Sequence, residues 1–260
     1  MKKILIKDIL KKKGNAPLIC LTAYSKPIAK IIDKYCDIIL VGDSLGMVLY
    51  GMKSTRSVKF ETMIEHAKAV KKSANRSLVV FDMPYKTYSN RNVAYKNAKK
   101  AMKLTNCDAV KLEGGKNIVD IVNYLTKKGI PVMGHIGLLP QHSSNFKHKG
   151  KNNYQKKKIY GDALALTNAG AFAIVIECVV ESLAKKITNS IPIPTIGIGS
   201  SKYCDGQILV TDDIIGLSDF YPKFVKRYLN IKKTIENSII RYCKDVRFKK
   251  FPSSKNVYKN

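Results

Sequence analysis

From residue 109 the chain reads Ala109-Val110-Lys111-Leu112-Glu113-Gly114-Gly115, continues through the helix-compatible stretch Asn117–Lys128 and reaches a second apolar run, Pro131-Val132-Met133-Gly134. This order predicts a strand, a crossover helix and a second strand. A strand–helix–strand unit of this kind places its two strands parallel in one sheet, with a right-handed connection.

Similar units fill the rest of the chain. Short apolar runs rich in Val and Ile predict eight strands, which are Pro17–Thr22, Asp37–Val41, Ser77–Phe81, Ala109–Leu112, Pro131–Gly134, Phe172–Ile176, Ile193–Ile198 and Gln207–Val210. Apolar residues three and four apart predict the helices, which are Lys26–Tyr35, Lys59–Ala74, Asn90–Thr105, Asn117–Lys128, Gly161–Ala169, Ser182–Asn189 and a last one within Phe220–Tyr242.

Eight such units predict an α/β fold, the (β/α)8 or TIM barrel, whose usual length of about 250 residues suits this chain. The strands largely lack polar alternation, as expected where helices cover a parallel sheet. An open, doubly wound sheet is the alternative. We expect one domain over residues 1–260, with a loose basic tail from about residue 247.

Charge is the unusual feature of the composition: 47 basic and 19 acidic residues give a net charge of +28. A nucleic-acid-binding protein is one function class that this charge suggests. Its basic residues would gather on one face with Arg and aromatic side chains. The lysines are instead spread over nearly every predicted helix, so we expect no nucleic-acid partner.

The chain also lacks the features of a membrane or secreted protein. No run approaches the roughly 18 apolar residues of a membrane span, and the apolar stretch Ile4–Ile6 is too short for a signal peptide. The six cysteines form no C-x-x-C pair and predict buried thiols in a reducing compartment. We therefore expect a cytoplasmic protein with no membrane partner.

Ionisable residues stand at the ends of five consecutive predicted strands, namely Asp43, Asp82, Lys111 with Glu113, His135 and Glu177. In a (β/α)8 barrel these strand ends meet at the mouth that carries the active site. Buried carboxylates are costly without a counter-ion. Asp43, Asp82 and Glu113 therefore predict a site for a hard cation such as Mg²⁺, with Glu113 binding either directly or through water.

The other polar residues at the mouth suit an acidic substrate. Lys111 shares a strand face with Glu113 and is expected to pair with a substrate carboxylate, or else to form a structural salt bridge with an aspartate. Ser44 is expected to hold the same carboxylate. His135 is predicted to bind the substrate or orient a carboxylate, with a purely structural role as the alternative. Glu177 is predicted to be a general base.

Four longer motifs resemble the ketopantoate hydroxymethyltransferase family. They are Leu40-Val41-Gly42-Asp43-Ser44-Leu45-Gly46-Met47, Val110-Lys111-Leu112-Glu113-Gly114-Gly115, Pro131-Val132-Met133-Gly134-His135-Ile136-Gly137-Leu138 with Pro140-Gln141, and Ile196-Gly197-Ile198-Gly199 with Cys204-Asp205-Gly206-Gln207. The resemblance runs from about residue 4 to residue 252. Departures from the family pattern occur at Ser25, Val180, Ser200-Ser201 and the shortened loop 146–152.

The resemblance implies a barrel of the phosphoenolpyruvate/pyruvate type that depends on Mg²⁺ and is homo-oligomeric, typically a decamer. It places Asp43, Asp82 and Glu113 on the metal positions, Asp43, Ser44, Asp82 and Lys111 on the contacts of a 2-oxo acid, and Glu177 on the proton acceptor. The implied reaction transfers a hydroxymethyl group from 5,10-methylenetetrahydrofolate to 3-methyl-2-oxobutanoate through a Mg-bound enolate and gives 2-dehydropantoate for pantothenate biosynthesis. The folate is a co-substrate.

A second enzyme class remains open, namely a C–C lyase that forms an enolate on the same barrel. A lyase of the isocitrate lyase type would carry a catalytic cysteine in a mobile loop, whereas the cysteines here lie in strands or ordinary contexts.

Overall fold

The computed structural model describes residues 2–143, 147–219 and 221–258. The chain divides into two compact units, Met1–Val210 and Thr211–Asn260. All eight strands belong to the first unit. The prediction of a single domain over residues 1–260 stays a prediction.

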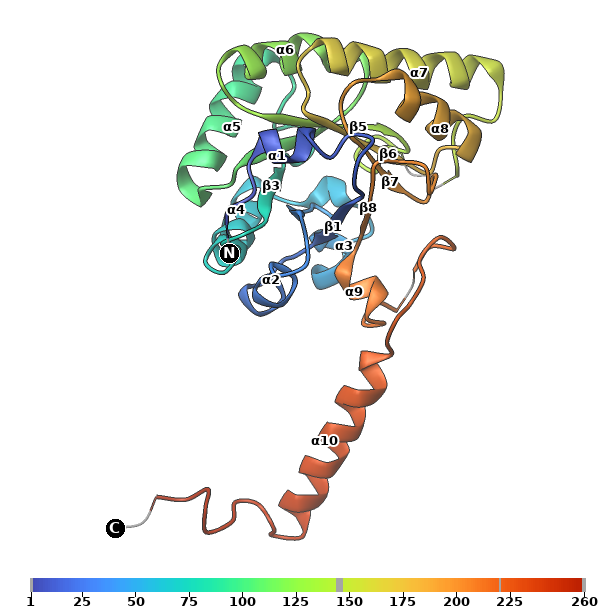
Figure 1. Ribbon diagram of the computed structural model, residues 1–260. Coiled ribbons are helices and arrows are strands. Elements are labelled where there is room, and N and C mark those ends of the chain that lie inside the picture. Colours follow the sequence, from blue (N-terminus) through green and yellow to red (C-terminus); the bar gives the residue numbers. More distant parts are fainter. Residues whose placement is uncertain (1, 144–146, 220, 259–260) are drawn as a thin grey trace. The chain divides into compact units, whose positions relative to one another are not determined.

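The first unit is a closed barrel of eight parallel strands in sequential order (Figure 1). The strands are β1 (Leu18–Thr22), β2 (Ile38–Val41), β3 (Leu78–Asp82), β4 (Ala109–Glu113), β5 (Val132–Gly137), β6 (Ala173–Glu177), β7 (Thr195–Ile198) and β8 (Gly206–Leu209). Pairing of β8 with β1 closes the sheet. The predicted barrel is therefore confirmed, and the open sheet is excluded.

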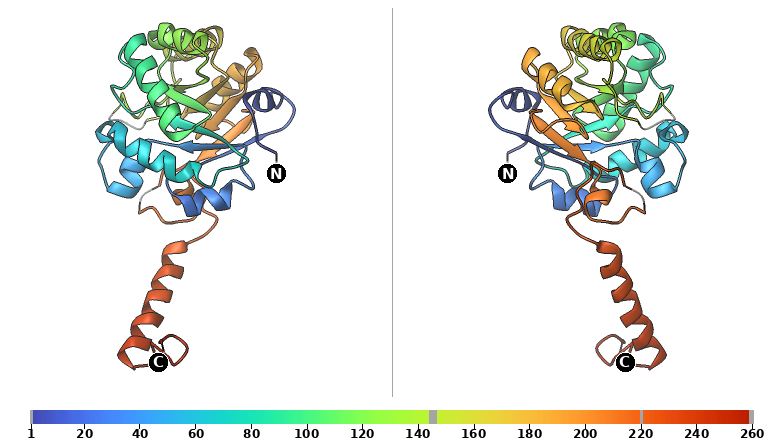
Figure 2. Two further views of the ribbon diagram at one scale, coloured as in Figure 1. Left: turned by 90° about the vertical axis from the view of Figure 1, so that its left-hand side faces the viewer. Right: turned by 90° about the vertical axis from the view of Figure 1, so that its right-hand side faces the viewer.

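Helices cover much of the outer face of the barrel (Figures 1 and 2), whereas Ile19 of β1 and Gln207 of β8 are exposed. The helices of the first unit are α1 (Ile6–Leu10), α2 (Lys26–Ile32), α3 (Leu45–Tyr50), α4 (Phe60–Lys71), α5 (Arg91–Thr105), α6 (Val119–Lys127), α7 (Asn153–Asn168) and α8 (Glu181–Ser190), with 3-10 turns η1 (Thr55–Ser57) and η2 (Lys116–Ile118). Helices α1 and α3 were not predicted from the sequence.

Helix α7 begins at Asn153 and not at Gly161, as the sequence predicted. Its first turns include Lys156, Lys157 and Lys158, which face no core and give no apolar period. The start is instead fixed by Asn152, whose side chain accepts a hydrogen bond from the Gln155 backbone N–H.

Side chains of each strand alternate between two apolar clusters. Residues such as Leu40, Val80, Met133 and Val175 fill the barrel interior. Their neighbours, such as Ile39 and Phe81, pack with the covering helices. Because side chains alternate along a strand, residues two positions beyond an interior residue also face the barrel axis. This periodicity brings the charged strand ends together.

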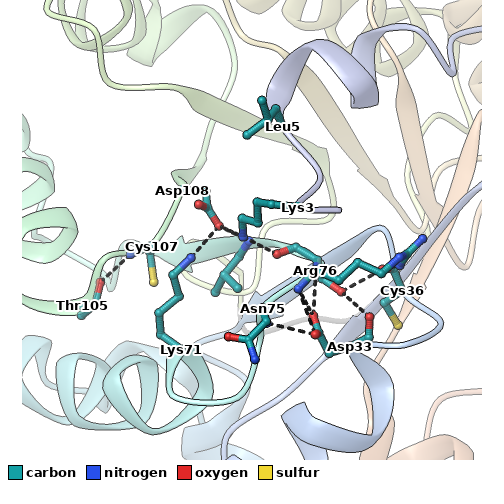
Figure 3. A network of polar contacts seen from close by, with 12 residues as sticks. Lys3, Leu5, Asp33, Cys36, Lys71, Asn75, Arg76, Thr105, Cys107 and Asp108 are labelled. Atoms are coloured by element: carbon teal, nitrogen blue, oxygen red, sulfur yellow. Dashed lines mark hydrogen bonds and ion pairs between the residues drawn. The ribbon is translucent and has the colours of Figure 1, made fainter. Parts of the chain in front are cut away.

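Three strands are each preceded by an aspartate whose carboxylate binds the strand before it. Asp37, Asp108 and Asp205 directly precede β2, β4 and β8, and accept hydrogen bonds from the backbone N–H groups of Ile19, Val79 and Thr195. Three lysines of the first 13 residues pair with these carboxylates: Lys12 with Asp37 at 2.8 Å, Lys3 with Asp108 at 2.7 Å and Lys13 with Asp205 at 2.9 Å. The N-terminal segment therefore binds this end of the barrel (Figure 3).

Asp33, at the end of α2, binds the chain entering β3. Its carboxylate accepts backbone hydrogen bonds from Asn75, Arg76 and Ser77 at 2.7–3.1 Å (Figure 3). Burial alone would raise the pKa of Asp33, but these donors favour the charged form more strongly and hold the pKa below its ordinary value.

We expect Asp33→Asn to destabilise the protein by about 1–3 kcal/mol at pH 7, because the amide NH₂ opposes backbone donors that the carboxylate accepts. A carboxylate with a lowered pKa stabilises the fold above its ordinary pKa of about 3.9, and this contribution is lost as the pH falls through the folded-state pKa. Urea unfolding of both proteins at pH 7, 4 and 3 should therefore show a difference in unfolding free energy that changes little down to pH 4 and narrows below it. A difference that is independent of pH would contradict this role.

The second unit contains α9 (Thr211–Ile214) and α10 (Ile231–Arg247). Helix α10 starts within the predicted range Phe220–Tyr242 and ends beyond it; Tyr221–Asn230 is not helical, and Phe220 lies outside the described residues. Pro222 disfavours helical geometry at the residue before it. None of the side chains of α10 is buried.

Candidate functional site

Strand register places the predicted site residues side by side. Asp82 of β3 lies directly beside Lys111 of β4, and Glu113 of β4 lies directly beside His135 of β5. All four continue the interior phase of their strands, which explains why they face one another rather than the helices. A chain of polar contacts thus crosses the mouth of the barrel.

Lys111 is the cation within this group. Its ammonium lies 2.6 Å from Asp82 Oδ1 and 3.9 Å from Glu113 Oε1. Burial alone would lower the pKa of Lys111, but the surrounding carboxylates outweigh burial and raise the pKa above its ordinary value. The structure therefore contains the Lys–Asp salt bridge considered as an alternative, at the position where the sequence predicts a substrate contact.

Asp43 joins the group from the loop after β2. Its backbone N–H donates to Asp82 Oδ2 at 3.2 Å. Burial raises the pKa of both carboxyl groups, and the nearby negative charges add to this effect. Additional positive charge near these two buried carboxyl groups would stabilise their ionised form.

His135 lies between two carboxylates. Its Nε2 is 3.1 Å from Glu177 Oε2, and its Nδ1 is 3.6 Å from Glu113 Oε1. Burial and Lys111 would lower the pKa of His135, but the two glutamates raise it to about 9. The raised pKa favours the protonated ring, although neither ring nitrogen meets hydrogen-bond geometry with its carboxylate.

Glu177 ends β6 with its side chain 13% exposed, the most accessible member of the group. Gly137 lies beside it in register and has a φ of +94°. A Cβ at Gly137 would approach the Glu177 carbonyl oxygen to 2.3 Å, so only glycine fits here. The close approach of the two backbones fixes where the Glu177 side chain begins.

Ser44 directly follows Asp43 in the chain and interacts with Tyr24. The two hydroxyl groups are 2.8 Å apart. His66 stabilises this edge of the mouth, with Nδ1 2.6 Å from the Tyr24 carbonyl oxygen and Nε2 2.9 Å from the Tyr50 hydroxyl group. Helix α4 carries this half-buried histidine onto the loop after β1.

Gln141 contacts two of these carboxylates and Tyr88 contacts Gln141, and sequence analysis gave neither residue a role. Gln141 is fully buried; its backbone N–H donates to Glu113 and its side-chain amide to Asp43. Tyr88 is buried and donates to the Gln141 side-chain oxygen. Gln141 belongs to the family motif Pro140-Gln141, but no signal in the sequence predicted that loop residues after β3 and β5 would meet.

The oxygen atoms of the site fit a hard cation. Within the described parts of the chain, no group of three or more His, Cys, Asp or Glu side chains has the geometry of a preformed metal site. Lys111 and Gln141 instead hold oxygen atoms of Asp82, Glu113 and Asp43. These three carboxylates nevertheless supply only oxygen donors, as Mg²⁺ prefers.

Comparison with known proteins decides the family. A sequence profile of ketopantoate hydroxymethyltransferase matches residues 3–254. The chain belongs to this family. It is 53% identical over 257 residues to 3-methyl-2-oxobutanoate hydroxymethyltransferase of Pelagibacter ubique (strain HTCC1062), with 99% of each chain covered. The enzyme of the same name from Anaplasma marginale (strain Florida) is 48% identical, with 97% of this chain and 92% of the relative covered.

Solved structures with low identity share the barrel of the family. A phosphonopyruvate hydrolase in complex with oxalate and Mg²⁺ is 12% identical with a TM-score of 0.62, covering 98% of this chain and 93% of that one. A 2,3-dimethylmalate lyase of the PEP mutase/isocitrate lyase superfamily is 10% identical with a TM-score of 0.60, covering 93% and 87%. These structures support the (β/α)8 fold.

The departures from the family pattern lie around the mouth and replace none of the proposed ligands. Ser25 and Val180 precede α2 and α8. The Ser200 hydroxyl group donates to the Ile176 carbonyl oxygen at 3.0 Å. Of the loop 146–152, Phe146 lies outside the described residues, and the Lys149 N–H donates to the Cys178 carbonyl oxygen.

Across the described residues, no helix combines the length and apolar character needed to cross a bilayer.

Proposed function

We propose that the protein transfers a hydroxymethyl group from 5,10-methylenetetrahydrofolate to 3-methyl-2-oxobutanoate and forms 2-dehydropantoate. Family membership supports the reaction class. The observation that carries the proposal is the arrangement at the mouth, where three carboxylates and Lys111 lie on one side of His135 and Glu177 lies on the other.

Asp43, Asp82 and Glu113 would hold Mg²⁺, which when bound supplies a Lewis acid for the keto group of the substrate. Lys111 and Ser44 would hold the substrate carboxylate. This use of Lys111 requires its ammonium to exchange part of its contact with Asp82 for the substrate. The buried position makes that exchange favourable only for an anionic ligand.

Glu177 would remove the proton from C3 of the oxo acid. Its Oε2 lies 3.1 Å from Nε2 of His135, and this contact would orient the carboxylate towards the substrate. The C3–H bond breaks as the proton moves to Glu177, and C3 forms the new bond to the methylene carbon of the folate. Both carbon–nitrogen bonds of the folate methylene carbon break. One water supplies the hydroxyl oxygen, and the two folate nitrogens take up the proton from C3 and one proton of the water.

The proposal is tested by incubating the protein with 3-methyl-2-oxobutanoate and Mg²⁺, with and without methylenetetrahydrofolate. We expect 2-dehydropantoate only with the folate, and C3 proton exchange in deuterated water without it. Product formation from formaldehyde alone at the same rate would contradict the folate as donor. Removal of divalent cations with EDTA should stop both reactions, and Mg²⁺ should restore them.

The alternative C–C lyase is disfavoured by the cysteines. All six are free thiols, and five of them are buried. Burial raises the pKa of Cys36 and Cys178 to about 12 and that of Cys107 to about 11. A catalytic cysteine would need an accessible thiol with a lowered pKa.

We infer that the protein is a homo-oligomer, and propose the decamer that is typical of the family. Ile239 and Tyr242 are 57% and 56% exposed on α10, and such exposed apolar side chains favour an interface. Light scattering after gel filtration should give the mass of ten chains, and Ile239→Lys should give smaller species. Asn237→Lys, on the same helix, is the matched control. A wild-type protein of single-chain mass would contradict the proposal.

A further inference from the structure

Gln141 makes four hydrogen bonds to the surroundings of the acidic cluster, although it is fully buried and carries no charge. Its backbone N–H donates to Glu113 Oε2 at 3.0 Å. Its Nε2 donates to Asp43 Oδ2 at 2.8 Å and to the Met83 carbonyl oxygen at 2.9 Å. Its Oε1 accepts from the Tyr88 hydroxyl group.

These partners fix the orientation of the amide. Both Nε2 hydrogens point at acceptors, and a flipped amide would set Oε1 against the Asp43 carboxylate and the Met83 carbonyl. Tyr88 supplies the matching donor. Burial raises the pKa of Tyr88 well above its ordinary value, so the phenol keeps its proton. The amide therefore has one favourable orientation.

We propose that Gln141 is a positioning residue that orients the carboxylates of Asp43 and Glu113 for a divalent cation, with Tyr88 locking its amide. The proposal rests on the metal ligands of the proposed function. Gln141 holds one oxygen of each carboxylate, Oδ2 of Asp43 and Oε2 of Glu113, and so limits rotation and turns the other oxygen away from itself.

A neutral amide is suited to this role. A lysine at this position would donate hydrogen bonds but would also neutralise Asp43 and compete with the cation. A glutamate would add a like charge to a buried acidic cluster. Glutamine orients the carboxylates and leaves their charge for the metal. Outer partners of metal-binding carboxylates commonly affect affinity in this way.

The test measures binding of Mn²⁺ alone to the full-length protein by electron paramagnetic resonance, together with the melting temperature of the metal-free protein. We expect Gln141→Met, which keeps the side-chain length, to weaken Mn²⁺ binding about 10- to 100-fold. Tyr88→Phe should weaken it less and in the same direction. Gln207→Met, on the exposed face of β8, is the matched control and should bind Mn²⁺ like the wild type.

Unchanged Mn²⁺ affinity in folded Gln141→Met, with only a lower melting temperature, would overturn the positioning role. If that variant does not fold, unchanged affinity in Tyr88→Phe overturns the proposed lock. Failure of the wild-type protein to bind Mn²⁺ or Mg²⁺ would instead reject the metal ligands of the proposed function, and the positioning role with them. The two failures are therefore distinguishable.

Discussion

Glu177→Gln is expected to slow C3 proton exchange of 3-methyl-2-oxobutanoate by roughly 10²–10⁴-fold, the usual contribution of a general base. The amide keeps the shape of the side chain but cannot accept the proton. Because the substitution leaves Asp43, Asp82 and Lys111 unchanged, binding of the oxo acid in the presence of Mg²⁺ should change little. Exchange is followed by proton NMR in deuterated water, without folate.

Glu181→Gln is the matched control. Glu181 is an exposed glutamate four residues further along the chain, at the first position of α8. There its charge complements the helix dipole. We expect exchange by this variant to equal that of the wild type. Exchange at the wild-type rate in Glu177→Gln would reject Glu177 as the base, whereas loss of oxo-acid binding would indicate a disturbed mouth.

Lys111→Met is expected to destabilise the metal-free protein by about 3–5 kcal/mol, because it leaves the buried carboxylates of Asp82 and Glu113 without their counter-charge. A divalent cation can compensate for the lost charge. Adding Mg²⁺ should therefore raise the melting temperature of the variant more than that of the wild type. Calorimetry with and without Mg²⁺ measures both effects.

The same variant separates the two roles considered for Lys111. If the ammonium also holds the substrate carboxylate, the affinity of the Mg²⁺-stabilised variant for the oxo acid falls well below that of the wild type. If Lys111 is only a structural partner of Asp82, the affinity stays unchanged once the protein is folded. Lys103→Met, on the exposed face of α5, controls for loss of one positive charge from a protein of net charge +28.

The sequence predicted the barrel and the six charged strand-end residues well, for one physical reason. Strand interiors are apolar, so ionisable residues such as Asp82 and Glu113 at their carboxyl ends are conspicuous, and the barrel geometry alone brings these ends together. Strand phase then decides that they face inwards. The members of the acidic cluster that lie on strands could therefore be predicted without knowledge of loop structure, whereas Asp43 lies in the loop after β2.

The contacts from loops could not be predicted in the same way. Gln141 and Tyr88 are polar residues in connecting segments, where neither periodicity nor composition indicates burial. Their burial depends on distant partners. Gln141 contacts Met83, which is 58 residues away, and Tyr88 and Gln141, which contact each other, are 53 residues apart. The start of α7 was missed because a run of lysines carries no apolar period. The contacts of His66 were missed because its partners come from other elements.

The lysine contacts of the N-terminal segment have a consequence for the order of folding. Lys3 binds Asp108, 105 residues away, whereas Lys13 and Gly14 bind Asp205, 192 and 191 residues away. During synthesis, the first residues of the chain leave the ribosome long before Asp205 does. Their last partners therefore arrive only when β8 is made, and contacts of such high sequence separation form slowly. The N-terminal segment must wait for nearly the whole barrel before it can complete its docking.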